Sequence, residues 1–225
     1  VAGGAGVTPQ TAEELFRAGV DVLTSGNHVW RKREAYELLR LDPRVLRPAN
    51  YPNGAVGTGS TIVETLKGQK VGILNLMGRV FMESLLDCPF RTAERELARL
   101  RLVTSVIVVD MHAEATSEKV AMGWFLDGKI SCLFGTHTHI PTADERILPK
   151  GTAFITDVGM TGPYDSVIGR RVDQILERFL SNIPNRSEVA EENVQLRALL
   201  VEVDPATGKA TAVARVTKTL DDTPR

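Results

Sequence analysis

Short apolar runs that alternate with helix-like stretches constrain the fold of this chain most. Three such runs are rich in β-branched residues, and capped or amphipathic stretches separate them: Val103–Val109, Ile130–Phe134 and Thr152–Asp157. A near-continuous apolar run of this length is typical of a strand that is buried on both faces of a parallel sheet. The alternation therefore predicts a layered α/β fold.

Turn and capping residues extend this prediction to the rest of the chain. We expect helices at Pro9–Ala18, Trp30–Leu39, Arg91–Arg101 (at the surface), Ser117–Asp127 and Val167–Leu180. A further strand is expected at Val20–Thr24, and hairpins at Thr61–Leu66 with Lys70–Leu76 and at Leu196–Val203 with Lys209–Val216. Residues 43–60 hold three prolines and several Gly and Asn residues, which predicts irregular loop.

Composition limits the classes of protein to consider. A length of 225 residues suffices for one domain, and 43% hydrophobic with 24% charged residues is ordinary for a globular protein. A net charge of −1 gives no reason to expect binding to nucleic acid or to a membrane surface. No apolar run approaches the length of a membrane span. The two cysteines, Cys88 and Cys132, form no disulfide framework, which predicts reduced thiols and a cytoplasmic location.

The positions of the histidines point to a site. All four histidines of the chain, His28, His112, His137 and His139, fall at or just beyond the carboxyl end of an expected strand. In open α/β sheets that edge is where ligands bind. If the backbone after Phe134 is extended, His137 and His139 project to one side while Thr138 turns away. Because imidazole is a common metal ligand, the cluster favours a metal site; solvated loop histidines are the alternative.

Polar neighbours of the histidines offer further candidates. The Asn27 side-chain oxygen suits a divalent cation, and His28 could protonate a leaving oxygen, although an Asn turn beside a solvated His explains the pair equally well. Asp110 and Glu114 could orient a ligand or shape a turn. Thr116 and Ser117 lie near a helix start and could contact phosphate or cap the helix. Asp144 and Glu145 are expected to be surface charges.

Several strings together resemble the calcineurin-like metallophosphoesterases. They are Gly26-Asn27-His28, the stretch from Asp110 to Lys119 and Gly135-Thr136-His137-Thr138-His139. The fuller strings Met77–Met82, Thr142–Asp144 and Thr156–Pro163 are similar to the bacterial YmdB-type branch, whose members are described as phosphodiesterases acting on cyclic nucleotides. The resemblance runs over nearly the whole chain and implies a layered β-sandwich flanked by helices.

The resemblance also implies roles for individual residues. Asn27, His112 and His137 would bind one divalent ion and His139 a second, while His28 would meet the phosphate or the leaving group. Fe, Mn and Zn all suit such ligands. The family also uses an Asp near the amino terminus and a Glu-Asn pair before the Ala-Gly-Gly loop. Because the chain starts at Val1-Ala2-Gly3-Gly4, we expect one domain, residues 1–225, that lacks its first βαβ segment.

The function that the resemblance implies is hydrolysis of cyclic nucleotides. Two ions would clamp the phosphate and activate a bridging water, and 2′,3′-cyclic nucleotides are the first candidate, with 3′,5′-cyclic nucleotides a further one. The alternatives are a phosphomonoesterase or protein phosphatase on the same core, or a non-catalytic scaffold. The partner would be a small phosphodiester rather than a membrane or nucleic acid, and self-association is a further expectation from the resemblance.

Overall fold

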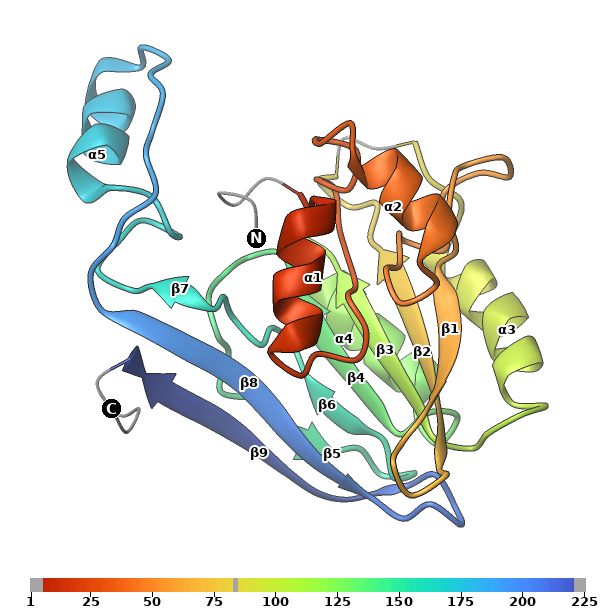
Figure 1. Ribbon diagram of the computed structural model, residues 1–225. Helices are drawn as coiled ribbons and strands as arrows, with labels where there is room; N and C mark the ends of the chain where they lie inside the picture. The colour runs from red at the N-terminus through yellow and green to blue at the C-terminus, as the bar shows by residue number, and fades with distance from the viewer. Residues whose placement is uncertain (1–5, 83–84, 221–225) are drawn as a thin grey trace.

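The computed structural model describes residues 6–82 and 85–220. Its centre is a six-stranded sheet in the order β1-β2-β3-β4-β6-β5 (Figure 1). The strands are β1 (Ser60–Glu64), β2 (Lys70–Met77), β3 (Ile107–His112), β4 (Cys132–Thr136), β5 (Arg146–Ile147) and β6 (Ala153–Ile155). The inner strands β2, β3, β4 and β6 are parallel, and the edge strands β1 and β5 run antiparallel to their neighbours.

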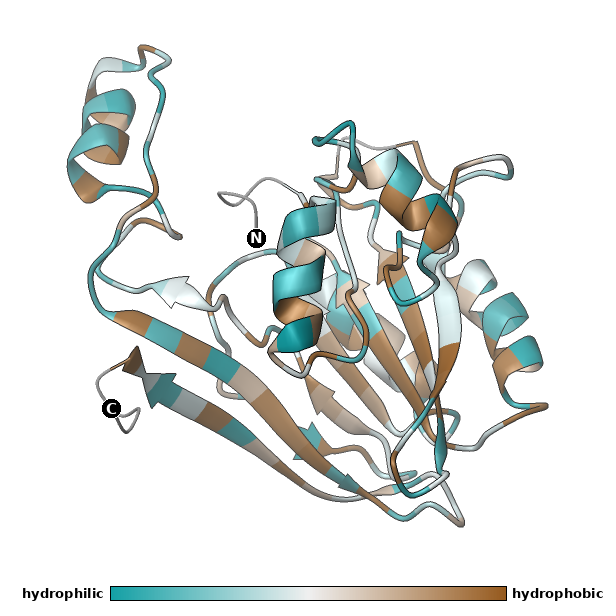
Figure 2. Cartoon of the chain, viewed as in Figure 1, coloured by the Kyte–Doolittle hydropathy of each residue, from teal (hydrophilic) through white to brown (hydrophobic). Residues whose placement is uncertain are grey.

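Two helices, α3 (Pro89–Leu100) and α4 (Thr116–Leu126), pack against the six-stranded sheet. Their apolar faces meet the sheet in the main core, which includes Leu76, Leu97, Val109, Met122 and Leu133. Burying one such side chain stabilises the fold by about 1.5–3 kcal/mol. Figure 2 shows the inner strands as almost continuously hydrophobic, as expected for strands buried on both faces.

A second, three-stranded sheet lies against the first one. It has the order β7-β8-β9, with β7 at Gly162–Pro163, β8 at Val194–Val203 and β9 at Ala210–Thr219. Its Leu199, Val201 and Val213 pack on Cys132 of β4 and Ala153 of β6. The fold is therefore a layered α/β sandwich flanked by helices, as the sequence predicted.

The amino-terminal helices form a separate small core. Helix α1 (Pro9–Arg17) begins with a capping box between Thr8 and Thr11, and α2 (Ala35–Leu41) follows a series of turns. Together with the loop after α2 they enclose a cluster of six buried residues: Val7, Ala12, Val29, Ala35, Leu39 and Val45.

Helix α5 (Val172–Ser181) stands away from both sheets, at the end of an excursion between β7 and β8 (Figure 1). We call residues 164–193 the arm. Because Pro163 pairs with Val194 and Gly162 with Gln195, the chain leaves and rejoins the second sheet at the same point. Among the described residues, no helix is long and apolar enough to cross a membrane.

Several predicted elements differ from the structure. Residues 20–24 form no strand and make only a bridge from Leu23 to Val45. The helix expected at Trp30–Leu39 begins only at Ala35, and the one expected at Val167–Leu180 begins at Val172, because turns occupy the preceding residues. The strand expected at Val103–Val109 begins at Ile107, since residues 101–103 form the turn that ends α3.

Candidate functional site

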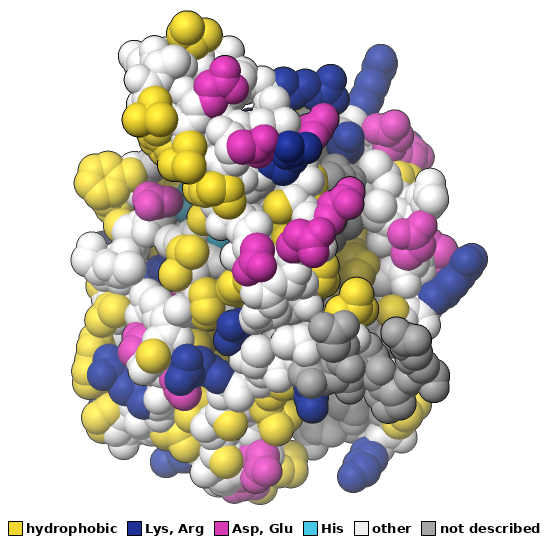
Figure 3. All heavy atoms as spheres, turned by 90° about the vertical axis from the view of Figure 1, so that its left-hand side faces the viewer, with side chains coloured by type: hydrophobic (Ala, Val, Ile, Leu, Met, Phe, Trp, Pro, Cys, Tyr) yellow, Lys and Arg dark blue, Asp and Glu magenta, His cyan; other side chains and the backbone are white. Residues whose placement is uncertain are grey.

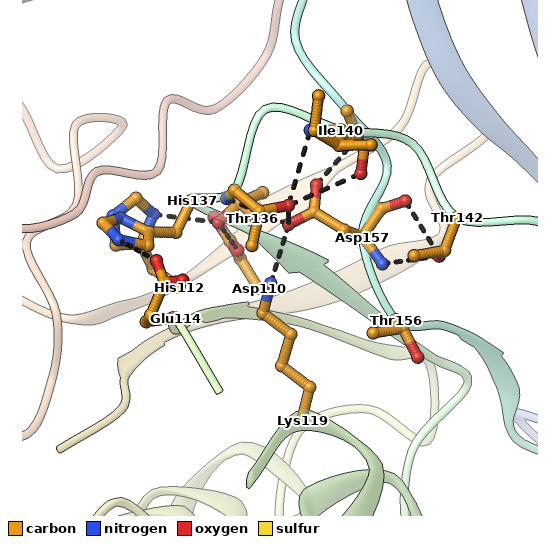
Figure 4. Close-up of polar contacts among 12 residues, drawn as sticks. Asp110, His112, Glu114, Lys119, Thr136, His137, Ile140, Thr142, Thr156 and Asp157 are labelled. Atoms are coloured by element: carbon orange, nitrogen blue, oxygen red, sulfur yellow. Dashed lines mark hydrogen bonds and ion pairs between the residues drawn. The ribbon is translucent and has the colours of Figure 1, made fainter. Parts of the chain in front are cut away.

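The parallel register of β3 and β4 brings two histidines together. His112 is the last residue of β3 and is paired with Thr136, the last residue of β4, so His137 follows directly beside it. The two imidazole rings are 4.8 Å apart between centroids, and Figure 4 shows them side by side at the end of the strands. The prediction that these histidines meet at one edge of the sheet is confirmed.

Asn27 reaches the same point from the loop after residue 26. Its Oδ1 lies 3.1 Å from Nε2 of His112. The loop can approach this closely because residue 26 is glycine: a Cβ there would overlap the His112 ring. Partly buried hydrogen bonds hold the loop, since the Ser25 hydroxyl donates to the Leu46 carbonyl (2.7 Å) and the Asn75 amide donates to the Ser25 carbonyl (2.8 Å).

The proton of His112 is placed by its neighbours. The Thr136 hydroxyl donates to Oδ1 of Asp110 at 2.8 Å, so its oxygen must accept the bond from Nδ1 of His112 at 3.0 Å. Burial, followed by the neighbouring His137, lowers the pKa of His112 to about 3, so the ring carries one proton only. That proton is on Nδ1, and Nε2 therefore presents a lone pair.

His137 is arranged in the same way. Its Nε2 lies 3.0 Å from Oε2 of Glu114, and because a carboxylate only accepts, Nε2 carries the proton. Burial is the largest cause that lowers the pKa of His137, and the ring is accordingly neutral. Its Nδ1 lone pair then points at Nε2 of His112, 3.1 Å away. Figure 4 shows Glu114 next to the two rings.

Three electron-pair donors therefore face one another with no hydrogen between them: Asn27 Oδ1, His112 Nε2 and His137 Nδ1. Such an arrangement is repulsive unless a cation lies among the three atoms, and nitrogen with amide oxygen suits Fe, Mn or Zn. Among the described residues, no three His, Cys, Asp or Glu side chains are grouped so that they could hold a metal ion, and the third donor here is an asparagine. The donor set fits a divalent ion.

His139 lies on the same pocket but is held differently. Its Nδ1 donates to the carbonyl of Ile168 in the arm at 2.9 Å, which leaves Nε2 as a lone pair. His137 and His139 have φ values of 103° and 68°, so the prediction of extended backbone here is wrong. Non-glycine residues in this left-handed region are strained and are often found at functional sites.

A buried ion pair beneath the loop explains this conformation. Lys119 donates to Oδ2 of Asp157 at 2.7 Å, and the two side chains are only 0% and 1% exposed. The same Asp157 oxygen accepts from the backbone N–H and the hydroxyl of Thr138, at 3.2 and 2.8 Å. These bonds draw Thr138 inward, and the histidines on either side of it line the pocket. Figure 4 shows the contact between Lys119 and Asp157.

His28 lines the pocket beside the other three histidines. Its Nδ1 is buried and has no hydrogen-bond partner among the described residues. Burial, followed by the charge of Arg31, lowers the pKa of His28, so its ring is neutral near pH 7. A buried polar atom without a partner is costly, and the residue as a whole lines the pocket.

The pocket has a volume of about 690 Å³, within the range of small-molecule sites. The four histidines line it together with residues of the loop after β6 and of the base of the arm, including Met160, Ile168 and Arg170. The remaining wall is apolar and includes Leu15, Leu23 and Val45.

The other predicted site residues have mixed outcomes. Thr116 and Ser117 are exposed on the first turn of α4, outside the pocket, and the expected capping is wrong because this helix has no side-chain cap. Asp144 and Glu145 are not free surface charges: Asp144 accepts from the Thr156 backbone at 3.1 Å, and Glu145 pairs with Arg215 at 2.8 Å.

Sequence reasoning missed the roles of Thr136, Lys119 and Asp157 in orienting the site. No local signal identifies Thr136, which looks like any strand residue. Lys119 did carry a signal for burial, because the residues that follow it in α4, 120–126, have no polar or charged side chain except the indole N–H of Trp124.

Solved structures with the same architecture define the class of this protein. A hypothetical protein from Thermus thermophilus aligns with a TM-score of 0.89 and 40% sequence identity, over 96% of this chain and 83% of that one. A crystal structure described as a novel phosphatase from Mycoplasma pneumoniae aligns with a TM-score of 0.87 and 36% identity, over 96% and 78%. The fold is of the metallophosphoesterase type.

Sequence comparison gives the particular family. The family model described as YmdB-like protein matches residues 1–216. A protein of Bacillus subtilis (strain 168) named 2′,3′-cyclic-nucleotide 2′-phosphodiesterase is 45% identical over 213 residues, which cover 95% of this chain and 80% of the relative. The chain belongs to the YmdB-like family, and it is a hydrolase. The resemblance noted in the sequence is confirmed.

Proposed function

We propose that this protein is a metal-dependent phosphodiesterase that opens 2′,3′-cyclic nucleotides by hydrolysis of the bond between phosphorus and the 2′ oxygen. The observation that carries the proposal is the meeting of three lone pairs, from Asn27, His112 and His137, at one end of a pocket of about 690 Å³. The name of the B. subtilis relative supports the choice of substrate. The product would be the 3′-monophosphate.

Each histidine has a separate task in this proposal. His112 and His137 would hold one ion together with Asn27, and His139 would offer its free Nε2 to a second. When bound, the two ions supply charge neutralisation at the phosphate and a hydroxide nucleophile near neutral pH. Asp110 acts through Thr136 to hold the proton on Nδ1 of His112. Glu114 holds the proton on Nε2 of His137 directly.

His28 is the proposed group for the leaving oxygen. Its buried Nδ1 has no partner among the described residues, and the ring lies in the pocket with Arg170. Hydrolysis adds a hydroxyl group to phosphorus and a proton to the departing 2′ oxygen, so a hydrogen-bonding imidazole at that oxygen lowers the barrier. Because His28 is not one of the three donors that face one another, its loss should spare the metal.

The site as described offers few ligands for two ions, and we propose that a segment upstream of Val1 completes it. Along residues 196–203, β8 has one hydrogen-bonded neighbour among the described strands, and residues 20–24 make only one bridge. Apolar side chains beside these free edges are exposed, including Val20 (36%) and Leu200 (59%). Added strands would cover this surface and bring the acidic ligands that the family resemblance implies.

Location and partners follow from the same proposal. The thiols of Cys88 and Cys132 are both free, which supports a reducing cytoplasm. A small phosphodiester is the proposed partner, and the near-zero net charge of −1 argues against stable nucleic-acid binding.

The test compares metal content and turnover in the protein of full natural length. We expect Asn27→Ala and His137→Ala to lose their bound metal. Their rate of hydrolysis of 2′,3′-cyclic nucleotides should fall by more than about 100-fold, which exceeds the usual loss when a residue that only orients a metal ligand is removed. His28→Ala should keep the metal and lose rate. Asn53→Ala, an exposed loop asparagine, is the matched control and should behave as the parent.

Linear phosphate monoesters, assayed alongside, separate this proposal from a phosphomonoesterase. A parent protein that turns over monoesters but not cyclic diesters would contradict the proposed substrate. A parent protein that binds metal and hydrolyses neither would indicate a scaffold instead.

A further inference from the structure

One arginine stands out among the residues of the pocket. Arg170, at the base of the arm, is the one Lys, Arg, Asp or Glu residue among the described residues that line it. Figure 3 shows a histidine side chain (cyan) set back below the hydrophobic side chains at the top of the molecule, where Figure 1 has the arm. A guanidinium stays protonated in proteins. Arg170 therefore brings a permanent positive charge to a lining with no other fixed charge.

A tight turn fixes the backbone of Arg170. Its N–H donates to the carbonyl of Val167 at 3.0 Å, and the N–H of Val167 donates to the Arg170 carbonyl at 2.8 Å. The two residues between them, Ile168 and Gly169, have φ of 46° and 95°. Positive φ at both central positions is the mark of the type I′ turn. A β-branched residue is strained in this conformation, and such strain is often found at functional sites.

Hydrogen bonds hold this turn against the rest of the arm. The Ser166 hydroxyl accepts from the Gly169 N–H at 2.9 Å and donates to the Pro163 carbonyl at 2.6 Å, which ties the turn to β7. The Arg170 side chain donates from Nη1 to the Ser187 carbonyl at 3.3 Å. Because a guanidinium has five N–H donors, this bond is compatible with contact to a ligand in the pocket.

The charge of Arg170 acts on His28. Burial is the largest cause that lowers the pKa of His28, Arg31 follows, and Arg170 also contributes. Both residues line the same pocket, so an anion bound there can meet the imidazole and the guanidinium together. Among anions, phosphate suits a guanidinium best in shape, because the planar fork donates to two of its oxygens at once.

We propose that the Arg170 side chain binds a non-bridging oxygen of the substrate phosphate, which makes the base of the arm part of the substrate site. The inference rests on the proposed function, in which the cyclic phosphate lies beside His28. Arg170 is then a substrate-binding residue, and it comes from a different element than the histidines of the sheet rim.

This contact predicts an effect that depends on the charge of the ligand. A cyclic diester carries one negative charge, whereas the 3′-monophosphate carries about 1.5–2 near pH 7. Since attraction to a guanidinium grows with the charge of the anion, loss of Arg170 should weaken product binding more than substrate binding. The inhibition constant of the 3′-monophosphate and the KM of the cyclic substrate measure the two. A residue that only supports the fold would weaken both equally.

Calorimetric titration of inorganic phosphate into the metal-loaded, full-length protein tests the contact without turnover. Arg170→Met should raise the dissociation constant roughly 10- to 100-fold, the loss expected when a hydrogen bond to a charged group is removed. Arg170→Lys keeps the charge without the fork and should recover part of the loss. Arg186→Met is the matched control: Arg186 is an exposed residue of the arm outside the pocket, and its variant should bind phosphate as the parent does.

Two outcomes overturn the inference. One is an Arg170→Met variant that binds phosphate as tightly as the parent, with circular dichroism that shows a folded chain. The other is an equal loss in Arg186→Met, which would point to the overall charge of the arm. If phosphate binding depends on Arg170 while the parent hydrolyses no cyclic nucleotide, the contact is supported and the proposed function is contradicted. The two proposals can therefore fail separately.

Discussion

The rim of the six-stranded sheet and the arm both contribute to one pocket, but they hold their histidines by different means. At the rim, side chains orient the ring: Asp110 fixes Thr136, and Thr136 fixes His112, among residues that are buried or half-buried. At the arm, a backbone carbonyl orients the ring, since Ile168 accepts from His139 in an exposed contact. We therefore expect the rim to be sensitive to side-chain substitution and the arm to be sensitive mainly to displacement of its backbone.

The largest expected effect comes from the ion pair beneath the rim. Lys119→Met leaves the Asp157 carboxylate buried without its cation and should cost about 3–5 kcal/mol in the free energy of unfolding. Asp173→Ala removes an exposed ion pair of the arm, with Arg171, and should leave that free energy unchanged. Urea unfolding measures both. A loss below about 1 kcal/mol for Lys119→Met would show that the pair is no more important than a surface one.

The next effect concerns the orientation of His112. Thr136→Val keeps the shape of the side chain but removes the hydroxyl that accepts from Nδ1 of His112. We expect metal affinity and kcat/KM to fall about 10–100-fold, as for other groups that orient metal ligands. Thr136→Ser retains the hydroxyl and should restore most of the loss. Equal defects in both variants would indicate that the methyl group matters and not the hydrogen bond.

A smaller effect is expected at the base of the arm. Ile168 has φ of 46°, which a β-branched residue adopts only with strain, and Ile168→Gly should relieve about 1 kcal/mol or more while keeping the carbonyl that holds His139. We expect kcat/KM to fall by less than about tenfold, which is the smallest loss expected for Thr136→Val. A larger loss would mean that the side chain, and not the backbone, positions His139.

The smallest effect uses the cysteines as probes of how closed the contact between the two sheets is. Burial raises the pKa of the Cys132 thiol in β4 to about 12, so below that pH the thiol is protonated and unreactive. A chromogenic disulfide reagent at about pH 8, near the ordinary thiol pKa, should modify only the partly exposed Cys88 in the folded protein, and both cysteines after unfolding. Modification of Cys132 in the folded state would show that β4 opens on the timescale of the reaction.

The sequence was sufficient for elements whose stability is local or comes from continuous apolar runs. The capped helix α1, the β1–β2 and β8–β9 hairpins and the parallel strands β3 and β4 were all predicted, with boundaries that shifted by a few residues. The positions of His112 and His137 followed from the same logic, because parallel strands end at a common edge.

Other features depend on contacts between distant residues and could not be predicted. The strand expected at Val20–Thr24 lacks the neighbours that would complete its pairing among the described residues. The left-handed conformations of His137 and His139 depend on Asp157, which lies 19 residues beyond Thr138 in the sequence and accepts its hydrogen bonds. Local patterns carry no information on such a bond, and extended backbone is the default assumption after a strand.

The pairing of Gly162 with Gln195 and of Pro163 with Val194 has a consequence for how this protein could diversify. Since the intervening excursion starts and finishes at neighbouring positions, its outer part can be lengthened, shortened or exchanged without disturbing the register of either sheet. Selection could thus remodel the tip of the excursion while the histidines at the rim of the sheet keep their places. The tip and the pocket would then change independently of each other in such a chain.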